Sequence, residues 1–138
     1  MKPVVVDSNV ILDVATDDPN WGAWSADNLE KLADEAILVI NPLIYAEVSV
    51  GFQRIEELEQ LLGDELFHRE PLPWAAGFLA GKAFLTYRRQ TGTRRSPLPD
   101  FYIGAHAAVR DYRLLTRDRS RYETYFPSID VIGPQRAP

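Results

Sequence analysis

Short apolar runs alternate along the chain with longer segments in which apolar residues recur every three or four positions. The runs have the length and β-branched content of buried strands, whereas the longer segments have the period of amphipathic helices. Strands are predicted at residues 4–6, 37–40, 65–69, 112–116 and 129–132. Helices are predicted after Ser8-Asn9 and Asn41-Pro42, from Ser25 onward, and over residues 55–62, 73–90, 100–111 and 119–125. Strands that alternate with helices in this way predict an α/β fold, in which a parallel sheet is covered by helices on both faces.

Breaks in the pattern agree with these elements. Asp18-Pro19-Asn20 ends the first helix, and Asn41-Pro42 supplies an N-cap followed by a proline at the first helical position. Residues 91–99 contain a glycine and two prolines and are predicted to form a loop. In a parallel α/β sheet the functional site lies outside the carboxyl ends of the strands. Polar residues that follow a strand are therefore the first candidates for function.

The composition fits one compact domain over residues 1–138. Hydrophobic residues make up 46% of the chain, which is enough to form a core. The absence of cysteine excludes disulfides and thiolate zinc sites. No apolar run reaches the roughly 18 residues that a membrane-spanning helix needs, and no signal peptide precedes the first strand. We therefore expect a cytoplasmic protein that does not contact a membrane.

The net charge of −5, from 15 basic and 20 acidic residues, argues against a protein that coats nucleic acid. It is compatible with a nuclease, because a metal site needs several carboxylates whose charge bound cations would cancel. Arg94 and Arg95, in the predicted loop, are candidates to contact RNA phosphates, and a solvated loop without that role is the alternative.

Four acidic residues stand where a shared site is expected. Asp7 follows the first strand, Glu47 lies in the helix after the second, and Asp118 comes two residues beyond Leu114-Leu115-Thr116. Asp100 lies in the first turn of the helix that leads into that last strand. Carboxylates are the ligands that Mg²⁺ and Mn²⁺ prefer, and such ions activate water against a phosphodiester. We expect Asp7 and Asp100 as principal metal ligands, Asp118 as a further ligand, and Glu47 completing the catalytic cluster directly or through water.

Each acid also has an ordinary structural interpretation. Asp7 could be a turn or helix-capping residue. Glu47 could be a solvated helix residue, although its apolar neighbours favour burial, and a buried carboxylate needs a partner. Asp100 suits a helix start because of the helix dipole, and Asp118 among arginines could form a surface ion pair. Only the joint placement of the acids favours a metal site.

Three further residues are candidates to support the acids. Ser8 and Asn9 could hydrogen-bond a water or a phosphate, but helix capping is the favoured interpretation. Thr116 could orient Asp118, and an ordinary β-branched strand residue is the alternative. The two histidines form no motif and are interpreted as structural or surface residues: His68 and His106.

Taken together, segments along the whole chain resemble the PIN domain family. The segment VVVDSNVIL at 4–12 resembles the opening strand and D-S/T-N/S signature of that family. NPLIYAEV at 41–48 is similar to the segment with its glutamate, and LPDFYIGAHA at 98–107 to the segment with its third acid. LLTRDRSRY at 114–122 is similar to its L-x-T-x-D…Y ending. The sequence departs mildly at Gly104 and His106, where small aliphatic residues are more usual, and this affects packing rather than chemistry.

The resemblance implies a three-layer α/β/α sandwich with a parallel five-stranded sheet and a Mg²⁺- or Mn²⁺-dependent endoribonuclease. It carries Asp7, Glu47, Asp100 and Asp118 over as the acidic tetrad, and Thr116 as a supporting residue. The small size, without a further domain, is similar to the VapC-type toxins of type II toxin–antitoxin pairs. The resemblance therefore also implies a homodimer, an RNA substrate and a VapB-like antitoxin that blocks the site.

Other functions stay open at this point. A PIN nuclease used in RNA processing would keep the chemistry without arresting growth. A non-catalytic binding module would keep the fold, although the intact acids weigh against it. A phosphate-receiving regulatory domain is disfavoured, because no paired acids precede Asp7 and no lysine follows a late strand.

Overall fold

The computed structural model of the chain describes residues 1–91 and 98–135. Its strands form one five-stranded parallel sheet in the order β3-β2-β1-β4-β5. The strands are β1 (Val4–Val6), β2 (Leu38–Ile40), β3 (Phe67–Arg69), β4 (Arg113–Leu115) and β5 (Val131–Ile132). The helices are α1 (Ser8–Ala15), α2 (Gly22–Glu35), α3 (Pro42–Ser49), α4 (Ile55–Leu61), α5 (Trp74–Thr91), α6 (Leu98–Arg110) and α7 (Arg119–Tyr125).

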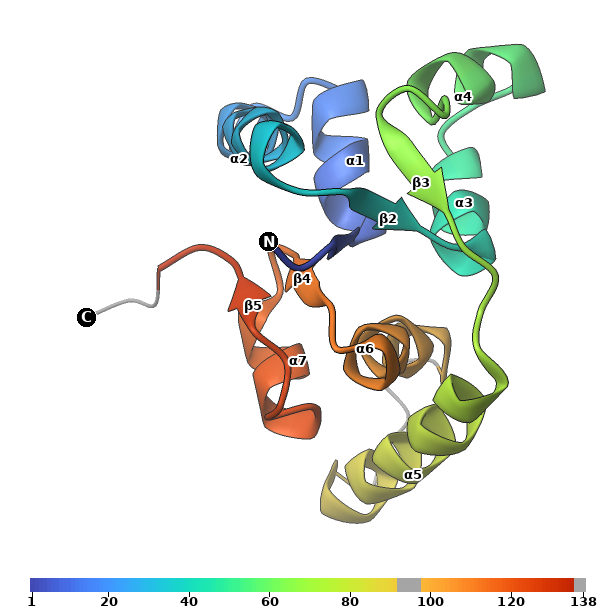
Figure 1. Cartoon of the computed structure of the whole chain (residues 1–138), viewed down its shortest axis with the longest axis vertical. Helices are drawn as coiled ribbons and strands as arrows, with labels where there is room; N and C mark the ends of the chain where they lie inside the picture. The colour runs from blue at the N-terminus through green and yellow to red at the C-terminus, as the bar shows by residue number, and fades with distance from the viewer. Residues whose placement is uncertain (92–97, 136–138) are drawn as a thin grey trace.

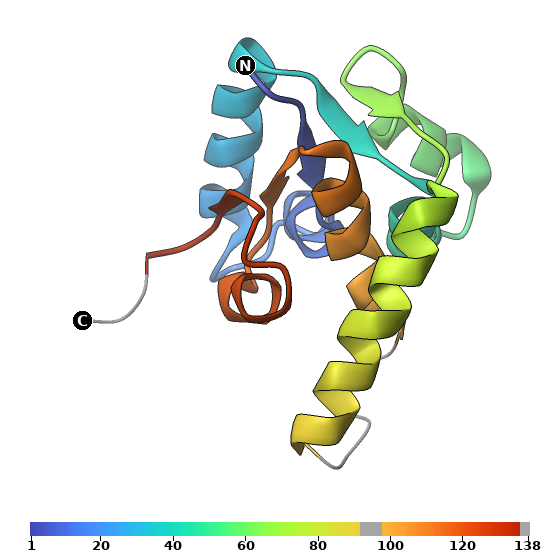
Figure 2. The same cartoon turned by 60° about the horizontal axis from the view of Figure 1, so that its bottom comes forward.

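The elements form three layers. In Figure 1 the helices α1 to α4 lie on one side of the sheet, and α5, α6 and α7 lie on the other. Figure 2 shows that α5 is long enough to extend well beyond the sheet. This arrangement confirms the predicted α/β/α sandwich with a parallel five-stranded sheet.

Among the helices of residues 1–91 and 98–135, none combines the length and the apolar character needed to span a bilayer.

The central strand shows why the sheet forms. Val4, Val5 and Val6 are fully buried, since helices cover both faces of the sheet and β1 has a neighbouring strand on each side. Burial on both faces selects a continuous apolar run rather than an alternating one. At about 1.5–3 kcal/mol for each buried valine side chain, this strand contributes strongly to the core.

Helices α2 and α6 begin earlier in the chain than predicted. The second helix begins at Gly22 rather than Ser25, and the Asp18 carboxylate before it accepts hydrogen bonds from the Asn20 and Trp21 backbone amides. The sixth helix begins at Leu98, inside the predicted loop, so that Pro99 lies in its first turn. A proline is tolerated there, because the first backbone N–H groups of a helix have no intrahelical partner. Residues 92–97 of that loop lie outside the described residues.

Gly104 lies at a close contact between α6 and the end of α7. A Cβ atom at this position would come within 2.5 Å of the Phe126 ring, which is itself buried. The departure from a small aliphatic residue here therefore has a packing reason, because α6 and Phe126 approach too closely for a side chain.

Candidate active site

The candidate site lies at the carboxyl ends of β1 and β4, where the order of the strands reverses. The chain moves from β1 to β2 on one side, and β4 later pairs with β1 on the other. Such a reversal opens a crevice between the two connections. Asp7 follows β1 directly, and its backbone amide donates to the Leu115 carbonyl of β4 at 2.9 Å. Residues after β1 and after β4 are thereby brought together.

Asp7 is the most deeply placed of the acids. Its residue is 6% exposed, and its Oδ2 accepts hydrogen bonds from Thr116 Oγ1 at 2.8 Å and from Tyr122 Oη at 3.0 Å. Asp7 occupies the N-cap position of α1, yet its side chain makes no capping hydrogen bond. Its carboxylate is therefore directed at the site rather than used as a helix cap.

Ser8 and Asn9 do not cap α1, so the favoured capping interpretation was wrong. They are the first residues of the helix, and their side chains face the acids instead. Ser8 Oγ donates to Glu47 Oε1 at 3.0 Å, and Asn9 Nδ2 lies 3.4 Å from Thr116 Oγ1 and 3.5 Å from Asp7 Oδ2. Ser8 thus connects Asp7 with Glu47, and Asn9 connects Asp7 with Thr116.

Thr116 connects Asp7 with Asp118. Its hydroxyl donates to Asp7 and accepts a hydrogen bond from the Asp118 backbone amide at 3.0 Å. Thr116 therefore contacts Asp118 through its backbone amide, whereas the carboxylate that it contacts is that of Asp7. Thr116 is fully buried, so this link is shielded from solvent.

Asp100 and Asp118 share one arginine. Arg121 places Nη1 3.2 Å from Asp100 Oδ2 and Nη2 3.3 Å from Asp118 Oδ2. Asp118 is also the N-cap of α7, where its Oδ1 accepts from the Arg121 backbone amide at 3.4 Å. The ion-pair interpretation of Asp118 is thus correct, but the pair belongs to the acid cluster rather than to an isolated surface site.

The acids raise one another's proton affinity. Burial raises the pKa of Asp7 despite the hydrogen bonds from Thr116 and Tyr122, and the charge of Asp100 adds to that effect. Burial also raises the pKa of Glu47 against the Ser8 hydrogen bond, with further contributions from Asp7 and Asp100. Close like charges disfavour ionisation in the same way that burial does. The cluster therefore carries excess negative charge that a cation would relieve.

Asp100 shows the same behaviour at the more open side of the cluster. Burial raises its pKa, Arg121 opposes that shift, and the charge of Asp118 reinforces it. One guanidinium therefore does not fully compensate the two carboxylates that it contacts.

Two residues of this site were not among the candidate site residues: Arg121, one of the arginines near Asp118, and Tyr122, the last residue of the segment that resembles the family's ending. Tyr122 is 1% exposed, and burial together with the charge of Asp7 raises its pKa well above the ordinary value, so its hydroxyl stays protonated. Their spacing from Asp118 on one short helix was the available signal, since residues three and four apart share a helix face.

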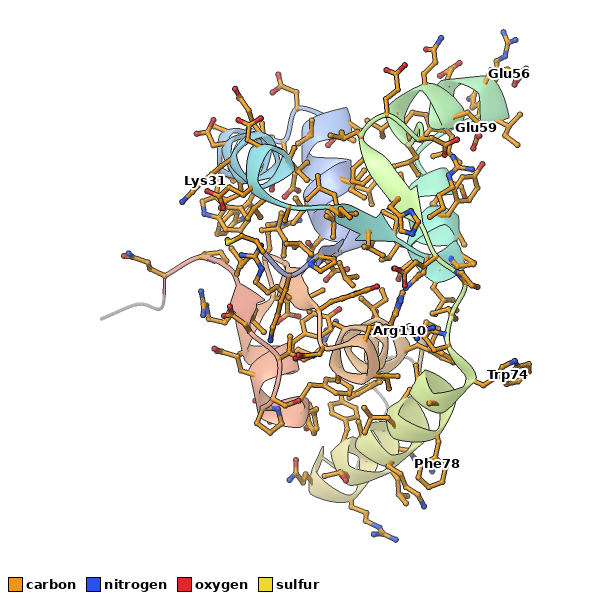
Figure 3. The ribbon with its side chains drawn as sticks, viewed as in Figure 1. Lys31, Glu56, Glu59, Trp74, Phe78 and Arg110 are labelled. Carbon is orange, nitrogen blue, oxygen red and sulfur yellow. The ribbon has the colours of Figure 1, made fainter. Side chains whose placement is uncertain are left out.

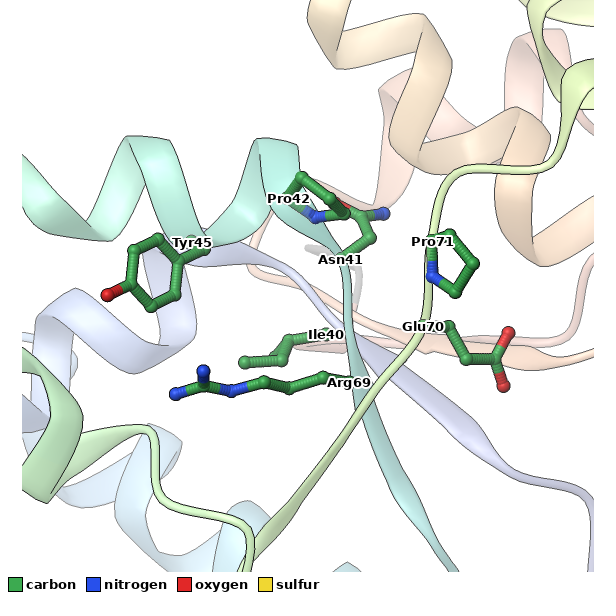
Figure 4. A pocket seen from close by; sticks show the side chains of 7 residues that line it. All are labelled: Ile40, Asn41, Pro42, Tyr45, Arg69, Glu70 and Pro71. Atoms are coloured by element: carbon green, nitrogen blue, oxygen red, sulfur yellow. The ribbon is translucent and has the colours of Figure 1, made fainter.

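The other sequence candidates lie elsewhere. His68 is exposed and His106 is fully buried, and neither contacts the acids through a hydrogen bond or ion pair in the described part of the chain. Arg94 and Arg95, proposed to contact RNA, lie outside the described residues. A separate cavity of about 350 Å³ opens between α3 and the segment after β3 (Figure 4), and none of the four acids lines it.

The chemistry of the donor set fits a hard divalent cation, although the present arrangement does not form a finished coordination site. Over residues 1–91 and 98–135, no three acidic or histidine side chains are arranged to hold a metal ion. The hydroxyl groups of Thr116 and Tyr122 hydrogen-bond one oxygen of the Asp7 carboxylate. The Arg121 guanidinium pairs with one oxygen each of Asp100 and Asp118. The four carboxylates offer only oxygen ligands, and three of them have raised pKa values. The Arg121 side chain is 31% exposed.

Comparison with solved structures shows a shared fold. A VapBC2 complex from Rickettsia felis, bound to a DNA fragment from its promoter, contains a chain with a TM-score of 0.72 and 18% identity, over 96% of this chain and 99% of that one. FitAcB from Neisseria gonorrhoeae has a TM-score of 0.70 and 20% identity, over 94% and 96%. A toxin–antitoxin complex from Klebsiella pneumoniae has a TM-score of 0.68 and 18% identity, over 97% and 99%.

Sequence comparison places the chain in a family. No curated protein matches the sequence. The family model described as PIN domain, however, matches residues 4–127, which is most of the chain and includes all four acids. The chain belongs to the PIN domain family.

Proposed function

We propose that this protein is an endoribonuclease that hydrolyses RNA phosphodiesters with Mg²⁺ or Mn²⁺ at Asp7, Glu47, Asp100 and Asp118. The observation that carries the proposal is the convergence of these carboxylates from four separate segments, with hydrogen bonds and mutual repulsion connecting them. An acid cluster with raised pKa values at a strand-order reversal is typical of a functional site rather than of a stabilising ion pair.

The residues around the acids have distinct roles in this proposal. Asp7 and Asp100 are the principal ligands, Asp118 is a further ligand, and Glu47 completes the cluster directly or through water. When bound, a divalent ion makes water a better nucleophile and neutralises charge that develops on the phosphate. Thr116 and Tyr122 hold Asp7 in one orientation, and Ser8 does the same for Glu47.

Arg121 has a second role in the proposal. It lies between Asp100 and Asp118, where it partly compensates their charge. With a divalent ion held by these carboxylates, the Arg121 guanidinium would be available to a phosphate oxygen of the RNA backbone, which its planar set of donors suits. The protein thus has a phosphate-binding group next to its acids even though its net charge is negative.

We further propose that the enzyme is the toxin of a type II toxin–antitoxin pair. The structures from Rickettsia felis and Klebsiella pneumoniae support this, since they are described as a VapBC2 complex and a toxin–antitoxin complex and span nearly the same length. The partners in this proposal are a VapB-like antitoxin that covers the acids and a second copy of the chain in a homodimer. In this proposal the protein acts in the cytoplasm, as the sequence leads us to expect.

The test is RNA cleavage by the Asp100→Asn variant. We expect the rate to fall by at least about 100-fold, because charge stabilisation at a reacting phosphate contributes on that order, while the circular dichroism spectrum stays unchanged. Asp111→Asn is the matched control, since Asp111 is an exposed acid paired only with Lys2 in the described contacts, and asparagine tolerates its positive φ of 58°. Mapping RNA ends in cells after induction then identifies the cleaved transcripts.

Cleavage of RNA by Asp100→Asn at the rate of the unmodified protein would contradict the proposed mechanism. Growth arrest that depends on Asp100 and is relieved by a neighbouring antitoxin gene supports the toxin. Cleavage of one precursor RNA without growth arrest would instead support an RNA-processing nuclease.

A further inference from the structure

A second buried polar cluster lies outside the acid site, between α3 and α6. His106 of α6 is fully buried, and both of its ring nitrogens have partners. Its Nδ1 lies 2.9 Å from Asn41 Nδ2, and its Nε2 lies 3.2 Å from Glu70 Oε1. Figure 4 shows Asn41 and Glu70 on adjacent segments, beyond the ends of β2 and β3.

The hydrogen bonds determine which nitrogen of His106 carries the proton. Asn41 Oδ1 accepts from the Ile44 backbone amide at 2.9 Å, which directs the amide nitrogen of Asn41 toward the imidazole. Because that nitrogen can only donate, His106 Nδ1 must accept and the proton is on Nε2. The Nε2–H group then donates to Glu70, which also accepts from Tyr112 Oη at 2.6 Å.

The charges around the imidazole agree with its neutral form. Burial lowers the pKa of His106 from its ordinary value, against the opposing influence of the Glu70 carboxylate. Burial raises the pKa of Glu70, but the hydrogen bonds from Tyr112 and His106 outweigh it and leave the pKa low. Arg110, labelled in Figure 3, lies 4.0 Å from Glu70 Oε1, and His68 lies 3.8 Å from Oε2. Glu70 therefore stays ionised, and the imidazole donates to it without carrying a charge.

This cluster connects the helices that carry two of the candidate acids. Asn41 is the N-cap of α3, and Glu47 lies on that helix. His106 lies on α6, which has Asp100 in its first turn. The hydrogen bond between Asn41 and His106 therefore joins the start of the Glu47 helix to the middle of the Asp100 helix.

We propose that His106 is a positioning residue, which holds α3 against α6 through Asn41 and so sets the placement of Glu47 relative to Asp100. Its effect on cleavage rests on the proposed function, whereas its effect on the placement of the helices does not. A displacement of about 1 Å at a reactive group can lower a rate 100-fold, so a link between the two supporting helices can affect catalysis without touching substrate.

Two substitutions separate the two contacts of His106. The side-chain amide of asparagine reaches the position of Nδ1, so His106→Asn keeps an acceptor for Asn41 and loses the contact with Glu70. The amide of glutamine reaches the position of Nε2, so His106→Gln keeps a donor for Glu70 and loses the contact with Asn41. Comparison of the two variants therefore shows whether the hydrogen bond from His106 to Asn41 matters, or whether any buried polar side chain at this position is sufficient.

The experiment measures RNA cleavage and ¹H–¹⁵N spectra of the full chain for both variants. We expect His106→Gln to lower kcat by about tenfold with KM changed less than twofold, and to shift the amide signals of residues 44–48. His106→Asn should retain most of kcat and leave those signals close to their original positions. Long-range ¹H–¹⁵N correlations of the unmodified protein should show an unprotonated Nδ1 and a protonated Nε2 in His106.

The matched control is His68→Asn, which changes the chain's other histidine. His68 also lies near Glu70, but its side chain is 58% exposed and it has no contact with Asn41 among the described interactions. Equal kcat values and equal α3 shifts for the asparagine and glutamine variants of His106 would overturn the positioning role. The proposed function fails if the unmodified protein does not cleave RNA, or if its cleavage persists in Asp100→Asn. In either case the amide signals of residues 44–48 in α3 still test the role of His106.

Discussion

The acid cluster and the buried polar cluster of Asn41, Glu70, His106 and Tyr112 contain similar groups, but their carboxylates have pKa values that are shifted in opposite directions. Asp7 accepts from Tyr122 at 3.0 Å, and Glu70 accepts from Tyr112 at 2.6 Å, each with a second side-chain donor. Nevertheless the pKa of Asp7 is raised and that of Glu70 is lowered. Asp7 is more deeply buried and has another carboxylate near it, whereas Glu70 faces histidines and an arginine.

The difference shows what a buried carboxylate needs in order to be purely structural. Glu70 accepts hydrogen bonds from Tyr112 and His106 and lies 4.0 Å from Arg110, so it remains ionised without any added group. The acid cluster has several carboxylates that share Arg121, so its charge is not balanced by the protein alone. Deeper burial together with neighbouring carboxylates thus distinguishes the acid cluster from Glu70, whose hydrogen-bond donors outweigh its burial.

Divalent ions should give the largest effect that separates the two clusters. Mn²⁺ at about 100 times its dissociation constant should raise the free energy of unfolding by about 2.7 kcal/mol, because it binds only the folded protein. Asp100→Asn should lose most of this increment, while Glu70→Gln should keep it. Thermal unfolding with Mn²⁺ and with a chelator measures both. An equal increment in Asp100→Asn would show that the ion binds elsewhere.

A matched pair of glutamine substitutions should give the next largest effect, with opposite signs. In the metal-free protein at pH 7, Glu70→Gln should lower the free energy of unfolding by about 1–2 kcal/mol, because its charge-assisted hydrogen bonds are lost. Glu47→Gln should instead raise it by a few tenths of a kcal/mol, because a carboxylate with a raised pKa becomes neutral while its bond from Ser8 can persist, and solvent screening of this half-buried side chain keeps the gain small. Urea unfolding in a chelator measures both changes. Destabilisation of equal size in the two variants would contradict the comparison.

The sequence was sufficient for the layers of the fold and for the meeting of the acids. Valine-rich runs between amphipathic segments predict a buried parallel sheet, and residues after parallel strands meet at one edge. Asp7 and Asp118 could therefore be placed near each other from strand ends alone. The start of α6 at Leu98 was not predicted, because a proline near a helix start is compatible with either a loop or a first turn.

Side-chain partners were harder to predict, because they depend on segments far away in the sequence. Ser8 has the usual properties of a helix cap, and only the folded chain brings Glu47 to its hydroxyl from 39 residues away. Arg121 is one of several arginines near the chain's end; its spacing from Asp118 is a local signal, but its contact with Asp100 depends on the folded chain. His106 is recognisable as a departure from the family pattern, but its link to Asn41 requires the packing of α6 against α3.

The dependence of stability on pH should give the smallest and most specific difference between the clusters. A raised pKa in the folded state means that the contribution of Glu47 to stability is present below its unfolded pKa, near 4.5, and is lost as pH rises through the folded value. The advantage of Glu47→Gln over the unmodified protein should therefore shrink when the pH falls from 7 to 5.

Glu70 has the opposite sign. Its lowered pKa means that its contribution is present above the unfolded value of 4.5 and is lost only as pH falls through the lower folded value. The deficit of Glu70→Gln should therefore not shrink at pH 5. Urea unfolding of the three proteins in a chelator across this range measures both differences, and subtraction of the unmodified protein removes the titrating groups that do not interact with the substituted residue. If the two differences changed in parallel with pH, the neighbours of Glu47 and Glu70 would not have the opposite electrostatic effects that the structure indicates.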